Sequence, residues 1–340
     1  MKVTLKTIAA LADTSPATVS RVLTNCGYVK EETRRRIEMA IQQTGYTPKV
    51  PKYVSVKQTE KMILVISENI SGQVYIDYFQ GLSAYLGERG YFCLEAYTGQ
   101  NIDMEIRYLK FANENHFGAV VLLNILETPE LTRELENVQC PVVFVNRYLR
   151  SADVDAICVD NYRGGYAATK YLIDAGHTRI MHLAGIPTSV VSQDRMLGFH
   201  DAIMDAGLPY SKENVFQGNL KEDSGRKLGA WLATTPNDFT AVFVSNDLMA
   251  VGLLNSLHEC GLSVPDDISI VSFDTTPLAK NARVKLTTVG FNSHEMGEAA
   301  GEIVYQRVHS QKSSPRRVIY PASIDEGDSV KRLHKAAASE

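Results

Sequence analysis

The sequence of 340 residues has few of the features that mark secreted, membrane-spanning or zinc-binding proteins. Its five cysteines are scattered without a CxxC pair, which argues against a zinc ribbon or a disulfide framework and favours a reducing compartment. No apolar run is long enough to span a bilayer, and the opening residues lack the pattern of a signal peptide. We therefore expect a cytoplasmic protein without a membrane partner.

Short motifs of common enzyme classes are also missing. The sequence contains no GxSxG elbow, no P-loop, no GxGxxG turn and no HExxH helix, and its histidines have no metal-ligand spacing. These absences favour a protein that is not an enzyme, with no catalytic residues, no metal and no cofactor. A sugar- or nucleotide-processing enzyme is the alternative, which a turnover assay would decide.

Charge is distributed unevenly along the chain. The net charge is −4, but residues 1–61 carry eleven Lys and Arg against five Asp and Glu, a net charge of +6, and the rest carries −10. A basic head on an acidic body indicates that only the head binds a polyanion. Chance asymmetry is the alternative explanation.

Apolar patterning divides the chain into three segments. Residues 1–48 predict short helices without a strand, residues 49–61 a polar linker, and residues 62–340 runs of Val, Ile and Leu that alternate with helical patterns. Such alternation is typical of doubly wound α/β folds, in which parallel strands are buried under helices. We predict two similar lobes of five strands each. The runs that predict strands are 62–67, 92–97, 119–124, 142–146, 157–160, 180–184, 241–245 and 268–273.

The head predicts three helices, which span residues 5–12, 16–23 and 30–44. Thr4 and Ser15 are suited to cap the first two helices, because their hydroxyl groups can accept hydrogen bonds from free backbone N–H groups. Pro16 suits the first position of a helix, and Gly45 suits the end of the third. Two helices joined by a tight turn match a reader of the DNA major groove.

The head closely resembles the opening of the LacI/GalR family of transcription regulators through TLKTIAALADTSPATVSRVLTN. The match continues through YVKEETRRRIEMAIQQTGYTP and extends over almost the whole chain through HTRIMHLAG, SNDLMAVG and VPDDISIVSFD. The resemblance implies a transcription regulator, most simply a repressor. It would bind a palindromic operator in double-stranded DNA as a homodimer or a tetramer. It also implies a core like that of periplasmic sugar-binding proteins, with an effector between two lobes. Lobe one would span about 62–160 and 291–323, and lobe two about 161–290 and 324–340.

By this resemblance, Pro16, Ala17 and Arg21 face the base edges. Only Arg21 can form a bidentate pair with guanine, which gives about 1–3 kcal/mol of discrimination. Other residues carry hydroxyl groups placed to bond phosphates and to fix the register, namely Thr4, Thr18, Ser20 and Thr33. The alternative is that these are only helix caps and solvated helix residues.

The linker departs from the family pattern. Relatives place an Ala/Arg-rich hinge helix here, whose leucine wedges into the minor groove and kinks the operator. In this chain Pro51 disfavours a helix, Val50 and Val54 are poor helix formers, and Ser55 stands where the leucine is expected. We therefore expect no leucine wedge, and DNA that is bent less or differently.

Polar residues directly follow several predicted strands of the core, where α/β sheets present their ligand-binding loops. Asn146 and Arg147 follow one strand, Asn246 and Asp247 follow another, and Asp274 follows a third. We expect Asn146, Arg147, Asn246 and Asp274 to surround an effector, and Asp247 to cap the next helix. Capping of that helix is the alternative for Asn246, and capping of a turn is the alternative for Asp274.

The resemblance assigns effector contacts to Arg195, Asn246 and Asp274, and the apolar side of the ligand to Tyr75 and Leu220. An Arg, an Asn and a carboxylate suit a hydroxyl-rich molecule, most simply a sugar or a nucleoside, because the first two donate hydrogen bonds and the third accepts them. Relatives often have an aromatic residue in place of Leu220, so its absence speaks against a plain hexose. A lobe-bridging ion pair is the alternative role of Arg195.

Linkage would connect the core to the head. An effector that binds one lobe arrangement better than the other changes the spacing of the two heads in a dimer. The residues do not choose between inducer and corepressor, or between repressor and activator. Two further alternatives are a solute-binding protein for transport, against which the basic head counts, and a DNA-binding protein whose core has lost its ligand.

Overall fold

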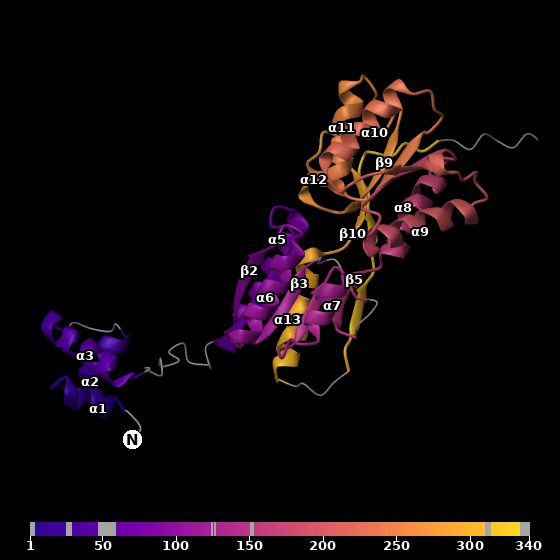
Figure 1. Ribbon diagram of the computed structural model, residues 1–340. Helices are drawn as coiled ribbons and strands as arrows, with labels where there is room; N and C mark the ends of the chain where they lie inside the picture. Colours follow the sequence, from indigo (N-terminus) through magenta and orange to yellow (C-terminus); the bar gives the residue numbers. More distant parts are fainter. Residues whose placement is uncertain are drawn as a thin grey trace, which may run out of the picture. The chain divides into compact units, whose positions relative to one another are not determined.

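The computed structural model describes residues 4–24, 29–46, 59–123, 125, 127–149, 153–309 and 314–333. The chain forms two compact units, Met1–Thr59 and Glu60–Glu340, which we call the head and the core (Figure 1). None of the helices in the described ranges combines the length and the apolar character of a membrane span. The linker predicted at residues 49–61, with Pro51 and Ser55, lies outside the described residues except for its last three.

The head consists of three helices, α1 (Leu5–Leu11), α2 (Pro16–Thr24) and α3 (Glu31–Thr44). Thr4 Oγ1 accepts a hydrogen bond from Thr7 N at 3.4 Å, and Ser15 Oγ accepts one from Thr18 N at 3.1 Å. Gly45 follows α3 with a left-handed φ of 59°. The expected caps and helix ends are therefore confirmed to within one residue.

A small apolar core holds these three helices together. Ile8, Val19 and Ile37 each contribute a fully buried side chain, one from each helix. Asp13 adopts a φ of 47° in the turn between α1 and α2, a left-handed conformation that Asp tolerates better than most residues. The tight turn therefore forms without a glycine.

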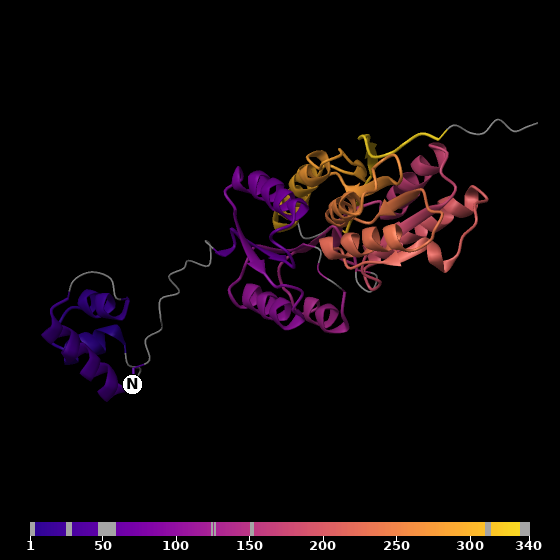
Figure 2. The same cartoon turned by 90° about the horizontal axis from the view of Figure 1, so that it is seen from above.

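Lobe one of the core contains a six-stranded parallel sheet in the order β11-β5-β4-β3-β1-β2. Its strands are β1 (Met62–Ser67), β2 (Phe92–Tyr97), β3 (Ala119–Leu123), β4 (Val142–Val145), β5 (Asp155–Val159) and β11 (Arg317–Tyr320). Two helices cover one face and two the other (Figure 2). The first pair is α5 (Gln73–Gly87) and α13 (Ser293–His309), and the second is α6 (Ile102–Glu114) and α7 (Pro129–Leu135).

Lobe two contains a second six-stranded sheet in the order β12-β10-β9-β8-β6-β7. Its strands are β6 (Ile180–Ala184), β7 (Val215–Gln217), β8 (Ala241–Val244), β9 (Ser269–Asp274), β10 (Thr287–Gly290) and β12 (Ser323–Asp325). Helices cover both faces, as Figure 1 shows. One face carries α8 (Asn161–Asp174) and α9 (Val190–Asp205), and the other carries α10 (Glu222–Thr234), α11 (Asp247–Glu259) and α12 (Pro277–Lys280).

The prediction of five strands in each lobe is wrong, because each sheet has six. The missed strands β7, β10, β11 and β12 have only three or four residues each. Strand β10 reads Thr-Thr-Val-Gly, which has no apolar pattern, yet it is buried between β9 and β12. The prediction of parallel sheets is confirmed, with one antiparallel pair at the edge of lobe two, where β12 pairs with β10. Only two residues separate β11 from β12, so the chain enters lobe two without a crossover helix and runs against its neighbour.

Strand β2 forms an exposed edge of lobe one. Phe92, Leu94 and Tyr97 are 65%, 44% and 53% exposed, although most strands were expected to be buried on both faces. The difference follows from the strand order, which pairs β2 with β1 alone. An apolar edge strand of this kind is open to association with another chain.

Two glycines allow α5 and α13 to pack at close range. A Cβ atom on Gly81 would lie 2.1 Å from the carbonyl oxygen of His294, and a Cβ atom on Gly297 would lie 2.3 Å from that of Tyr78. Both obstacles are backbone atoms, so a larger residue would force the two helices apart. This close contact fixes α5, which carries residues of the site described below.

We expect Gly81→Ala to lower the free energy of unfolding by about 1–3 kcal/mol, because the added methyl group overpacks the α5–α13 contact. Gly87→Ala is the matched control on the same helix, since a Cβ atom there would meet nothing within 4 Å. The control should be neutral or stabilising by up to about 1 kcal/mol. Urea unfolding followed by circular dichroism measures both, and equal effects would contradict the close packing.

Candidate functional site

A buried arginine ties together three elements of lobe two. Arg195 in α9 is 4% exposed. Its Nε donates to Asn161 Oδ1 at 2.9 Å, its Nη1 donates to the carbonyl oxygen of Ser245, and its Nη2 donates to Asp274 Oδ1 at 3.3 Å. These partners lie at the start of α8 and at the ends of β8 and β9. All of them belong to lobe two, so this ion pair does not bridge the lobes.

The end of β9 has an unusual backbone. Asp274 has a φ of 111° and Thr275 a φ of 57°, which are conformations that residues with side chains rarely adopt. Burial raises the pKa of the Asp274 carboxyl group to about 7, although the neighbouring charge of Arg195 opposes this change.

Asp247 holds this segment in place. Its carboxylate accepts hydrogen bonds from Ser272 Oγ at 2.5 Å and from Thr288 Oγ1 at 3.1 Å. It also accepts hydrogen bonds from the backbone N and the Oγ1 of Thr276, at 2.7 and 2.8 Å. Ser272 and Thr276 lie on either side of Asp274 in the chain. Asp247 is therefore a positioning residue for Asp274, and the expectation that it caps α11 is wrong.

Asn246 caps α11 instead, since its Oδ1 accepts a hydrogen bond from Met249 N at 2.9 Å. Its Nδ2 donates to the carbonyl oxygen of Leu220 at 3.0 Å. Leu220 has a left-handed φ of 64°, and a Cβ atom on Gly185 would lie 2.7 Å from its side chain. Capping thus accounts for one polar atom of Asn246, and the other atom positions Leu220.

Lobe one has its own buried ion pair. Arg147 Nη2 lies 3.8 Å from Glu68 Oε1, and Tyr75 Oη donates to the same oxygen at 3.1 Å. Glu68 follows β1 and Arg147 follows shortly after β4, so the carboxyl ends of two strands bring the charges together. Asn146 adopts a φ of 67°, and its backbone N–H donates to the carbonyl oxygen of Ile157 at 2.8 Å.

The clusters of the two lobes act on each other electrostatically. Burial is the largest cause of the raised pKa of Tyr75 in lobe one, and Asp274 of lobe two raises it further. Burial also raises the pKa of Tyr78, and here Asp274 is the second cause. We name this region the interlobe site and define it by Glu68, Tyr75, Tyr78, Arg147, Arg195 and Asp274.

Sequence reasoning missed Glu68, Tyr78 and Asn161. Glu68 directly follows the first strand of the core, so the rule that found Asn146 would also have found it. Tyr78 lies inside an apolar helix and Asn161 at the start of another, so neither residue carries a signal of its own.

The expected base-reading residues lie on the outer side of α2. Pro16, Ala17 and Arg21 are exposed, whereas Val19 and Val22 are buried against the rest of the head. The residues that the sequence assigned to DNA are thus free of the apolar core.

The expected phosphate-binding hydroxyl groups have less uniform surroundings. Thr4 Oγ1 lies 3.1 Å from Thr7 Oγ1, and Thr18 Oγ1 lies 2.9 Å from Ser15 Oγ. Ser20 in α2 and Thr33 in α3 are half-buried. The local contacts of Thr4 and Thr18 agree with helix capping, and each hydroxyl oxygen has a second lone pair for a further partner.

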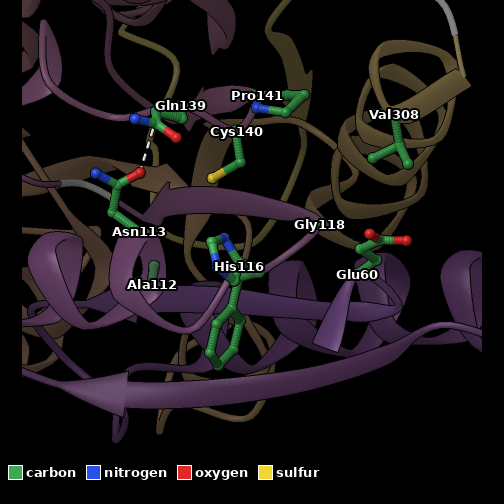
Figure 3. A pocket seen from close by; sticks show the side chains of 10 residues that line it. Glu60, Ala112, Asn113, His116, Gly118, Gln139, Cys140, Pro141 and Val308 are labelled. Carbon is green, nitrogen blue, oxygen red and sulfur yellow. Dashed lines mark hydrogen bonds between the residues drawn. The ribbon is translucent and has the colours of Figure 1, made fainter. Parts of the chain in front are cut away.

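A pocket opens at the amino-terminal ends of the lobe one strands (Figure 3). Its lining includes Glu60, Gly118 and Pro141, which precede β1, β3 and β4. At its wall Asn113 Oδ1 accepts a hydrogen bond from Gln139 N at 3.1 Å. The pocket is separate from the interlobe site, whose lobe-one ion pair lies beyond the other ends of these strands. In the part of the chain that the structure describes, no three His, Cys, Asp or Glu residues are placed to hold a metal ion.

Comparison with known proteins agrees with both parts of this description. Residues 4–49 match the model of bacterial regulatory proteins of the lacI family, and residues 169–330 match the periplasmic binding protein-like domain. The chain is 30% identical to the transcriptional regulator CelR of Thermobifida fusca over 323 residues, 93% of this chain and 95% of that protein. It is 28% identical to the transcriptional repressor PurR of Vibrio parahaemolyticus over 333 residues, 97% of this chain and 99% of that protein.

A solved relative has the same fold. The structure of a CelR–cellobiose complex superposes with a TM-score of 0.74 at 29% identity, over 96% of this chain and 100% of that one. A helix-turn-helix head on a two-lobed core defines a DNA-binding transcription regulator with a periplasmic-binding-protein-like domain. The chain belongs to the LacI family. The relatives named here are regulators and not enzymes.

The raised pKa of Asp274 predicts a specific pH dependence of stability. The unfolded carboxyl group loses its proton near pH 4, whereas the folded one keeps it to about pH 7. Its stabilising contribution is therefore complete below about pH 4 and is lost as the pH rises through 7, a change on the order of 4 kcal/mol at most. The carboxamide introduced by Asp274→Asn does not titrate, so this variant lacks the effect.

Urea unfolding of the wild type and of Asp274→Asn at pH 4.5, 6 and 7.5 measures this effect. We expect the wild type to lose stability relative to the variant as the pH rises. Burial also raises the pKa of Glu105 to about 7, but Glu105 is present in both proteins and cancels in the difference. Parallel pH profiles would show that Asp274 titrates normally.

Proposed function

We propose that this chain represses transcription by binding a palindromic operator as a homodimer, and that a neutral, hydroxyl-rich effector at the interlobe site sets its operator affinity. One observation carries the effector class: each buried guanidinium group of the site has a carboxylate of its own. Arg147 is paired with Glu68, and Arg195 with Asp274. An anionic effector would have to compete with these carboxylates for the positive charge.

The remaining polar atoms of the site suit hydroxyl groups. Carboxylate oxygens accept hydrogen bonds, phenol groups donate and accept them, and each guanidinium group has five N–H donors. Asp247 and Glu105 add two more acidic side chains, close to Asp274 and to Arg147 respectively, which can accept hydrogen bonds. The solved CelR complex with cellobiose, a neutral sugar, supports this choice.

Effector binding would act on DNA through the arrangement of the lobes. Tyr75 and Arg147 belong to lobe one, and Arg195 and Asp274 belong to lobe two, so a ligand that contacts both favours one lobe arrangement. The chain passes between the lobes three times, after β5, β10 and β11. A ligand can shift this equilibrium only by its difference in affinity for the two arrangements.

We infer a homodimer because a single head makes few contacts with DNA and binds it weakly. Two-fold symmetry doubles the contacts on a palindromic site, and a joined pair binds far more tightly than either head alone. The exposed edge strand β2, with Phe92, Leu94 and Tyr97, provides an apolar surface for a second copy.

Thermal unfolding of the full chain with neutral sugars, their phosphate esters and nucleosides tests the effector class. A neutral sugar at 100 times its Kd is expected to stabilise the protein by about 2.7 kcal/mol, whereas its phosphate ester should bind more weakly. The same sugar should change operator affinity in a gel-shift assay. Tighter binding of phosphate esters would contradict the proposal.

Arg21 is expected to read one base pair. We expect Arg21→Ala to relax the preference at one operator position by about 1–3 kcal/mol, because the bidentate contact to guanine is lost. Arg21→Lys is the matched control, since it keeps the charge but removes the fork of parallel donors. It should weaken selectivity and keep nonspecific affinity. Binding to a library of operator variants measures both, and an equal loss on every sequence would refute base reading.

A further inference from the structure

Tyr78 is a buried tyrosine whose hydroxyl group has no hydrogen-bond partner among the described residues. The side chain is 1% exposed and lies in α5. A buried polar group without a partner typically costs about 1–3 kcal/mol, and native proteins keep few of them. Tyr75, one turn earlier on the same helix, bonds its hydroxyl group to Glu68. The unsatisfied phenol of Tyr78 is thus particular to its position.

Tyr78 packs in one apolar cluster with Phe273, which directly precedes Asp274 and lies under the guanidinium group of Arg195. After burial, the carboxyl group of Asp274 is the largest cause of the raised pKa of Tyr78, and the positive charge of Arg195 opposes the change. Its ring stacks on Phe291, with 6.1 Å between the ring centres and 11° between the planes. The ring is therefore fixed by packing, and its polar end lies within the electrostatic reach of residues from lobe two.

Other hydroxyl groups near Arg195 and Asp274 share this condition. Ser192 lies one turn before Arg195 in α9, and Thr275 directly follows Asp274. Both side-chain oxygens are buried, and neither has a partner among the described residues. Two further unsatisfied hydroxyl groups thus belong to residues that lie close to this ion pair in the chain. Such a collection is typical of a site built to bind polar groups of a ligand.

Packing alone does not account for a tyrosine at this position. Phenylalanine would fill the same space against Phe291 without burying an unsatisfied hydroxyl group. The neighbouring Gly297 already gives α5 its close contact with α13, so the hydroxyl group is not needed to hold the helices together. What the hydroxyl group adds is a buried donor and acceptor that the described residues do not use.

We propose that Tyr78 is a specificity-determining residue, whose hydroxyl group forms a hydrogen bond with the effector hydroxyl that also lies against Asp274. This inference rests on the proposed neutral, hydroxyl-rich effector. A site built to bond a ligand hydroxyl group rejects an analogue that lacks it, because the buried protein group is then left without a partner. Tyr78 would therefore select among sugars by the presence of one hydroxyl group.

Two variants of the full chain test the proposal. Tyr78→Phe removes the unsatisfied hydroxyl group. Tyr85→Phe is the matched control on the same helix, where the ring lies under the guanidinium group of Arg89 at 3.6 Å. In urea unfolding without a sugar, Tyr78→Phe should be as stable as the wild type or more stable. A clear loss of stability would show that the hydroxyl group has an internal partner, and would overturn the proposal.

Calorimetric titration with D-glucose, D-ribose and cellobiose, and with monodeoxy analogues of the tightest binder, measures the contact itself. We expect Tyr78→Phe to bind the tightest sugar about tenfold more weakly than the wild type and the control do. One monodeoxy analogue should bind the wild type and Tyr78→Phe equally, since the lost ligand hydroxyl group is the partner of Tyr78.

The outcomes distinguish the proposed role of Tyr78 from the proposed class of effector. If the wild type binds a sugar and Tyr78→Phe binds it equally well, the role of Tyr78 is refuted and the effector class stands. If the wild type binds none of the neutral sugars, the proposed effector class fails, and the role of Tyr78 fails with it.

Discussion

The buried guanidinium group of Arg195 is the constraint on which the interlobe site depends. A charge removed from water is tolerated only when it is paired and hydrogen-bonded. Arg195 meets this requirement with the side chains of Asn161 and Asp274 and the carbonyl oxygen of Ser245, which come from three separate elements. Its satisfaction therefore fixes the start of α8 and the ends of β8 and β9 relative to one another.

The same ion pair accounts for the strained backbone at the end of β9. Asp274 and Thr275 hold left-handed conformations that cost about 1–3 kcal/mol each, and such strain persists only where the surroundings determine it fully. The hydrogen bonds of Asp247 to the residues on either side supply that determination. The position of Asp274 thus depends on a carboxylate from a different element, the start of α11.

The two ion pairs of the interlobe site lie on different lobes. Glu68 and Arg147 are satisfied within lobe one, and Arg195 and Asp274 are satisfied within lobe two. Neither lobe needs the other to pair its charges, so the arrangement of the lobes stays available as a variable. Under the proposed function, a ligand that joins the halves of the site would change that arrangement and with it the affinity for DNA.

The sequence by itself determined the features that depend on near neighbours in the chain, namely the three helices of the head with their caps and the longer buried strands. It also placed Arg195 and Asp274 in one predicted site, and the structure pairs these two side chains. Tertiary structure decided the rest. Strand β10 is a strand because its neighbours supply its hydrogen bonds, and Asp247 takes its hydrogen-bond partners from segments far away in the chain. Local sequence patterns reflect secondary-structure propensity. Side-chain burial and strand pairing depend on contacts between segments that are distant in the sequence.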